Sequence, residues 1–171
     1  MHDATVFSPQ REAAAIAAMQ QHNAMLFSTL AAYAEALVTA ASLQRRAAAD
    51  YVRLEMYEWC RTEILGHAQT EEAALYSRAR AEVEGSMLVE SMLEEHGVMA
   101  RFIEELGGAS DPVRAVAAAS ALLVVLESHL DKENTQLLPL LARSPYVSLA
   151  DQVAGRVELA GAGSEALGRT A

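Results

Sequence analysis

Apolar residues recur at intervals of three and four along four long stretches of the chain, and polar or turn-forming residues separate these stretches. This period is that of an amphipathic helix whose apolar stripe faces a core. Ser8 and Pro9 suit the N-cap and the first helical position of the first stretch, and Asp111 and Pro112 suit the same roles in the fourth. The pattern predicts four long helices, over residues 9–41, 45–81, 87–106 and 112–143.

The connections between these helices are short, and Ser86 is the expected N-cap of the third helix. Pro139 lacks an N–H group and is expected to kink or terminate the last turn of the fourth helix. Short connections place consecutive helices antiparallel. We therefore predict an all-α fold, an up-down-up-down four-helix bundle with a short C-terminal helix or tail.

We expect one domain over residues 1–160, because the four helices share a core and a chain of 171 residues suits a single domain. Residues 148–157 are predicted to form the short fifth helix, packed over the end of the bundle. Residues 161–171 are rich in small side chains and are predicted to be a flexible tail.

Composition narrows the class of protein. The net charge is −10 and Lys132 is the only lysine, which argues against the basic surface that nucleic acids and anionic membranes require. A lone Cys60 excludes an intrachain disulfide and fits a reducing compartment. No signal peptide is recognisable, and the apolar runs look interrupted or too short to span a bilayer. We expect a soluble cytoplasmic protein without nucleic-acid or membrane partners.

Polar residues that can bind metal ions interrupt the apolar stripes. In the second and fourth helices a histidine stands four residues before a glutamate, so both side chains share one face. On the first helix His22 falls on the apolar stripe, whereas Asn23 is assigned to the polar edge. Glu72 lies about 100° round from its neighbour and is expected to face outward or to support a ligand. The candidate ligands are His22, His67, Glu71, His96, His129 and Glu133.

Counting residues from each turn places the four histidines within about two helical turns of one level. Two buried glutamates at that level are costly unless they are paired, hydrogen-bonded or neutralised by protonation. A cationic metal cluster supplies positive charge and accepts neutral imidazole nitrogens. The alternatives are a metal-free structural bundle and a haem site, and the latter leaves both glutamates unexplained.

Imidazole and carboxylate ligands suit iron, manganese or zinc. Six such ligands exceed what one tetrahedral zinc ion needs. Two ions bridged by the two carboxylates would use all six, which favours a dinuclear iron site.

This order of residues resembles the hemerythrin-like domain, the HHE cation-binding family, over roughly residues 10–143. The resemblance implies a four-helix bundle with a carboxylate-bridged and oxo-bridged non-haem di-iron centre. It further implies that the two glutamates bridge the irons and that the histidines are terminal ligands. The matching elements are His22, His67-x-x-x-Glu71-Glu72 with Leu75-Tyr76, Glu95-His96, and His129-x-x-x-Glu133 with Leu138-Pro139.

One departure from the family pattern bears on function. Oxygen-carrying hemerythrins have a fifth histidine, on the third helix at His-x-x-x-His, but here Met92 and Ala100 stand four residues from His96. The predicted 4-His/2-Glu site has more open positions, which favours binding or reaction with O2, H2O2 or NO over reversible oxygen carriage. Catalase-like, peroxidase-like or NO-reactive activity is left open.

The alternative function is an iron, oxygen or redox sensor, or an interaction module without turnover. A sensor of this kind would need a redox or regulatory protein partner. Carrier, enzyme and sensor therefore stay open as alternatives at this point.

Overall fold

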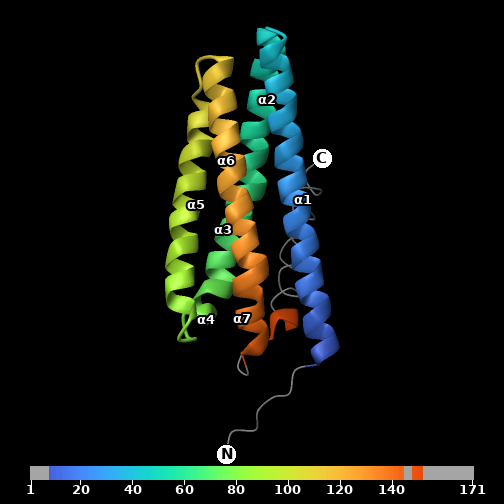
Figure 1. Cartoon of the computed structure of the whole chain (residues 1–171), viewed down its shortest axis with the longest axis vertical. Helices are drawn as coiled ribbons and strands as arrows, with labels where there is room; N and C mark the ends of the chain where they lie inside the picture. Colours follow the sequence, from blue (N-terminus) through green and yellow to red (C-terminus); the bar gives the residue numbers. More distant parts are fainter. Residues whose placement is uncertain (1–7, 145–147, 152–171) are drawn as a thin grey trace, which may run out of the picture.

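Four long helical segments lie side by side and antiparallel in the computed structural model, which describes residues 8–144 and 148–151 (Figure 1). The first is α1 (Pro9–Ser42) and the third is α5 (Gly85–Gly107). The second comprises α2 (Arg46–Trp59), η1 (Cys60–Ile64), α3 (Leu65–Glu71), η2 (Glu72–Tyr76) and α4 (Ser77–Ala79). The fourth comprises α6 (Pro112–Lys132), η3 (Glu133–Leu137) and α7 (Leu138–Arg143).

The described residues contain no strand, and consecutive segments pack together while α1 also packs against α6. The predicted all-α bundle is therefore confirmed. The fourth segment begins where its capping residues indicate, because Asp111 Oδ1 accepts hydrogen bonds from the backbone N–H groups of Val113 and Arg114, at 3.0 Å each.

The start of the third helix differs from the prediction. The helix begins at Gly85, so Ser86 lies inside it and is not the N-cap. Close packing explains the difference: a Cβ atom added at Gly85 would lie 1.8 Å from the carbonyl oxygen of Ala79. The residue that permits the tight connection is therefore the glycine, and no serine cap is needed.

Three π-helical turns, η1, η2 and η3, interrupt the second and fourth segments, and the sequence pattern did not reveal them. Two of them adjoin the predicted ligands, since η2 follows Glu71 directly and η3 begins at Glu133. Pro139 is the second residue of α7 and follows η3 closely, and the helix ends at Arg143, where the pattern predicts its end. The predicted kink at this proline stays a prediction.

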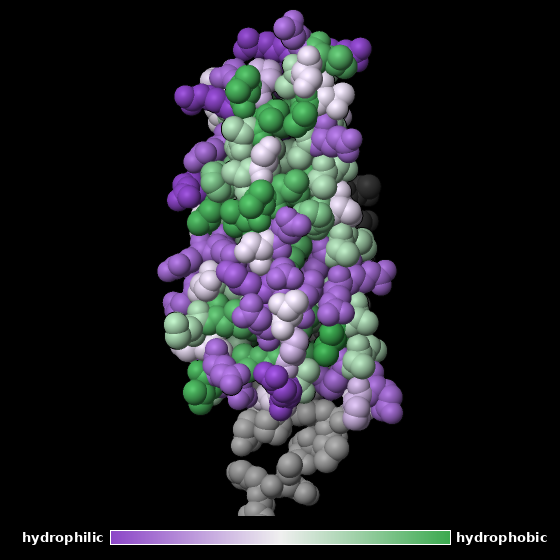
Figure 2. Space-filling model, in the orientation of Figure 1, coloured by the Kyte–Doolittle hydropathy of each residue, from purple (hydrophilic) through white to green (hydrophobic). Residues whose placement is uncertain are grey.

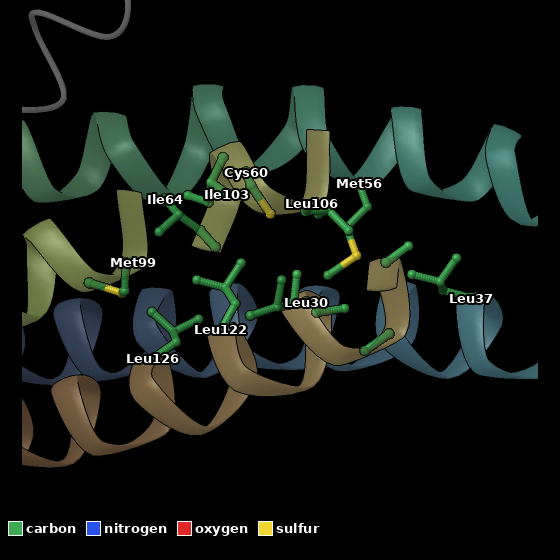
Figure 3. Packing of buried hydrophobic residues seen from close by; sticks show 14 of the residues in the cluster. Leu30, Leu37, Met56, Cys60, Ile64, Met99, Ile103, Leu106, Leu122 and Leu126 are labelled. Atoms are coloured by element: carbon green, nitrogen blue, oxygen red, sulfur yellow. The ribbon is translucent and has the colours of Figure 1, made fainter. Parts of the chain in front are cut away.

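The core consists of two apolar clusters. The upper cluster brings together side chains from all four segments, including Leu30, Ile64, Met99 and Leu122, which point toward one another in Figure 3. The lower cluster includes Met19, Leu75, Met92 and Leu137. Between them in sequence, on every long segment, lie the buried polar residues: Asn23, His67, Glu71, His96, His129 and Glu133. We call these six residues the polar layer.

The surface shows a related alternation. On the face seen in Figure 2, a hydrophilic band crosses the lower half of the bundle, with apolar residues above and below it.

The chain beyond α7 closes the lower end of the bundle. Residues 149–151 are helical and Leu149 is fully buried against the lower cluster. Glu12 of α1 anchors this segment, because its carboxylate accepts hydrogen bonds from Ser148 Oγ at 2.6 Å and from the backbone N–H of Leu149 at 2.8 Å. The rest of the predicted fifth helix and the predicted tail at 161–171 lie outside the described residues.

By length and composition alone, two helices among the described residues are apolar enough to cross a membrane, Pro9–Ser42 and Pro112–Arg143. Apolar stretches are thus longer than the sequence pattern suggested. Core helices of soluble bundles meet the same criterion, and both of these helices line the core and contribute to the polar layer. The absence of a membrane partner stays a prediction.

The capping geometry predicts a difference between two N-cap substitutions. Asp111→Ala removes both capping hydrogen bonds and should lower the free energy of unfolding by about 1 kcal/mol. Ser8→Ala is the matched control, because Ser8 makes no side-chain capping bond in the structure, and it should change the free energy by less than about 0.5 kcal/mol. Urea unfolding followed by circular dichroism measures both. Equal losses in the two variants would contradict this account of the cap.

Candidate metal centre

Three helical segments deliver five of the six predicted ligands to one buried level. His67 and Glu71 come from the second segment, His96 from the third, and His129 and Glu133 from the fourth, and each is at most 7% exposed. The i, i+4 spacing places His67 beside Glu71, as the sequence indicates. Three of these residues, His67, Glu71 and His129, offer ligand atoms within 4.8 Å of one another.

The first helix is turned differently from the prediction. Asn23, assigned to the polar edge, is 1% exposed, whereas His22, assigned to the apolar stripe, is exposed. The buried positions of α1 recur at Met19, Asn23 and Leu26, and this regular spacing runs through the asparagine. His22 lies at the edge of the polar layer, with its ring centroid 5.3 Å from that of His67. The ligand roles of all six residues stay predictions.

Asn23 is the first functional candidate that the sequence analysis missed. Its Nδ2 donates hydrogen bonds to Glu133 Oε2 at 2.7 Å and to Asn134 Oδ1 at 3.0 Å. The amide therefore fixes one oxygen of the buried carboxylate. Among the described residues, the other oxygen, Glu133 Oε1, has no hydrogen-bond partner although it is buried. A buried carboxylate oxygen left in this state is suited to a cation.

Glu71 divides the imidazoles into two groups. Its Oε1 lies 3.3 Å from His67 Nε2, and Glu133 Oε2 lies 3.7 Å from the same nitrogen. Its Oε2 lies 3.4 Å from His96 Nε2 and 3.3 Å from His129 Nε2. One carboxylate therefore faces His67 with one oxygen and the pair of His96 and His129 with the other.

Tyr76 is a second residue at the centre, and the sequence analysis gave it no role of its own. It is 2% exposed, and its hydroxyl lies 3.3 Å from Glu71 Oε2 and 3.1 Å from His96 Nε2. Burial and the charge of Glu71 raise the pKa of the Tyr76 hydroxyl, so the group stays protonated. The wider π turn η2 brings Tyr76, five residues after Glu71, back over the carboxylate, which α-helical spacing does not predict.

The electrostatics show why this layer suits a cation. Burial alone would raise the pKa of Glu71, but the charge of His67 and the hydrogen bonds from His129 and His96 hold it well below the usual range. Burial and the charge of Glu71 together raise the pKa of Glu133. Two carboxylates thus compete within one buried site, and a metal ion would relieve that competition by supplying positive charge.

Two further carboxylates support the histidines from outside the layer. Glu72 Oε1 lies 2.7 Å from His96 Nδ1, and Glu95 Oε2 lies 3.3 Å from His129 Nδ1. Burial lowers the pKa of His96, but hydrogen bonds to Glu71 and Glu72 outweigh it and raise the pKa. A carboxylate that holds the Nδ1 proton of a histidine leaves Nε2 for a metal ion, and this is the usual support of metal-binding histidines. Both Nε2 atoms face the polar layer.

The family comparison agrees with this geometry. Residues 14–141 match the hemerythrin HHE cation-binding domain. The match covers well over half of the chain, so the protein belongs to this family of cation-binding domains. No curated protein and no solved structure matches the chain significantly. Cation binding is therefore the class of function, and the buried cluster of His67, Glu71 and His129 is compatible with it.

The contact between Asn23 and Glu133 predicts a measurable loss of stability. Asn23→Ala removes the amide that binds Glu133 Oε2 and leaves a buried carboxylate less satisfied, so the free energy of unfolding should fall by about 1–3 kcal/mol. Gln21→Ala, at an exposed position of the same helix, is the control and should have little effect. Urea unfolding in the presence of a chelator makes the measurement independent of metal. Equal stability of the two variants would show that the amide does not support Glu133.

Proposed function

We propose that the polar layer holds two iron ions and that the protein binds or reacts with a small oxidant, O2, H2O2 or NO. The observation that carries this proposal is the position of Glu71, whose two oxygens face two separate groups of imidazoles. A carboxylate in that position is suited to bridge two ions. His67, together with His22 at the edge of the layer, would hold one ion, and His96 with His129 would hold the other.

Glu133 is suited to be the second bridge. Its Oε2 lies on the side of His67, and its Oε1 has no hydrogen-bond partner among the described residues. On the other side, the Tyr76 hydroxyl lies next to His96, the histidine of the third helix. Met92, one of the two positions where a fifth histidine would stand, is fully buried in the lower cluster and has no oxygen or nitrogen in its side chain. The Tyr76 hydroxyl provides a polar oxygen beside His96 in its place.

The surroundings favour a very small ligand. Glu71, His129 and Glu133 are completely buried, and apolar clusters lie on both sides of the layer. Iron would exchange electrons with the bound oxidant, which the amino-acid side chains of the polar layer do not do by themselves. The chain itself orients the ligands, limits access of water and holds one hydroxyl proton, that of Tyr76, at the centre.

A sensor without turnover is the second candidate, and the burial of two carboxylates favours it. Neutralising Glu71 and Glu133 by a bound cation stabilises the folded chain, so occupancy would be coupled to the stability of the bundle. In that case a redox or regulatory protein would read the stability or conformation of the bundle. A cytoplasmic location also stays part of the proposal.

The decisive experiment combines metal content with reactivity. Protein from iron-supplemented medium should contain about two irons per chain and should show oxo-bridged charge-transfer absorption in the near ultraviolet. Addition of H2O2 or NO should consume the oxidant. His129→Ala should lose iron and the reaction, whereas His2→Ala, which changes a histidine outside the motif, should keep both.

The outcomes separate the two candidate functions. Iron at the expected stoichiometry with a melting temperature that falls on chelation, but without consumption of O2, H2O2 or NO, would favour the sensor. Wild-type protein without iron or any other metal at that stoichiometry would overturn both.

A further inference from the structure

Lys132, the only lysine of the chain, lies directly behind the polar layer at the end of α6. Its Nζ donates hydrogen bonds to Glu95 Oε1 at 2.7 Å and to Ser91 Oγ at 3.0 Å, both on α5. The Lys132 side chain is 26% exposed and that of Glu95 is 16% exposed. The pair is therefore more protected from water than the exposed ion pairs of this protein, such as Arg101 with Glu105.

Glu95 uses its two oxygens for different partners. Its Oε1 accepts hydrogen bonds from Lys132 and from Ser128 Oγ, the latter at 3.2 Å, while its Oε2 faces His129 Nδ1 at 3.3 Å. Ser128, His129 and Lys132 all belong to α6. The carboxylate of α5 is thus held from two points on α6 and presents its remaining oxygen to the buried imidazole between them.

The other supported histidine lacks such an arrangement. Glu72, which faces His96 Nδ1, is 44% exposed in its side chain, and no lysine or arginine within the described part of the chain pairs with it. Only the carboxylate behind His129 is fixed by a cation. Positive charge close to a cation site disfavours the bound metal by simple repulsion. The presence of Lys132 at this position therefore needs another explanation, and its hydrogen bonds provide one.

We propose that Lys132 is a positioning residue that acts on His129 through Glu95. It holds the Glu95 carboxylate at His129 Nδ1, which keeps the proton on that nitrogen and directs Nε2 to the polar layer. This inference rests on the proposed function, because it assigns His129 as a metal ligand. It adds the residue that determines how strongly the subsite of His96 and His129 binds its ion.

The test is a double-mutant cycle on the full chain, with Co²⁺ as the probe metal and a competing fluorescent chelator. Lys132→Met keeps the length of the side chain but removes its donor and charge, and it should weaken binding of one of the two Co²⁺ ions about tenfold or more. Lys132→Arg keeps a donor and should bind nearly as wild type does. Arg101→Met removes a positive charge from an exposed pair and is the control for net charge.

The cycle distinguishes positioning from a general effect of charge. Glu95→Ala should weaken the same ion, and the double variant Lys132→Met/Glu95→Ala should be no weaker than Glu95→Ala alone, because Lys132 acts only through Glu95. Visible absorption of bound Co²⁺ should change in Lys132→Met and return in Lys132→Arg. Losses that add in the double variant, or a Lys132→Met variant with unchanged or tighter binding, would overturn the proposal.

Two further measurements separate this inference from the proposed function. Metal-free Lys132→Met should melt within a few degrees of metal-free wild type, so weaker binding is not a loss of fold. Labelling with ¹⁵N-lysine gives a single ammonium signal, that of Lys132. Slow hydrogen exchange of this ammonium group is expected if Lys132 is paired with Glu95. Exchange as fast as that of free lysine would contradict the pairing. If wild type binds no metal, the proposed function fails; if wild type binds two ions and Lys132→Met matches it, only this inference fails.

Discussion

The structure depends on the cost of keeping two carboxylates within one buried layer of a helical bundle. Glu71 and Glu133 are both fully buried, and a buried charge that is not compensated costs several kcal/mol. Each long segment contributes a polar side chain at this level, and the apolar residues divide into one cluster above and one below. A bundle built in this way gives up part of its apolar core for a polar layer. A cation bound in this layer would return stability at the same place, so folding and binding would be coupled.

The support of the layer extends outward in an ordered way. His96 and His129 face the centre with Nε2, and each has a carboxylate from another segment at Nδ1. Asn23 performs a similar task for Glu133. These contacts join all four segments, so the geometry of the site is fixed by the packing of the whole bundle and not by one loop. Such rigidity is what a metal centre with defined ligand positions requires.

The sequence predicts the helices and the two His-x-x-x-Glu pairs well, because both depend on local spacing. Prediction is poorer where a residue must be assigned to a face with only its neighbours as a guide, as for His22 and Asn23. It also fails where packing decides, as at Gly85, which accommodates the carbonyl of Ala79. Lys132 and His129, both on α6, are linked through Glu95 on α5. Periodicity along one helix gives no information about such a contact.

The π turns have a consequence for the inheritance of this domain. A π turn accommodates one residue more than an α-helical turn and absorbs it locally, so the side chains that follow keep the faces they would have in an α-helix one residue shorter. Deleting one residue other than Glu133 from Glu72–Tyr76 or Glu133–Leu137 would therefore restore an α-helical turn beside the predicted ligands and leave the lower cluster facing the core. The extra residue and the lower apolar pattern can therefore be inherited independently. In alignments of this family, a gap immediately after either glutamate would mark a lineage that lacks the wide turn beside the polar layer.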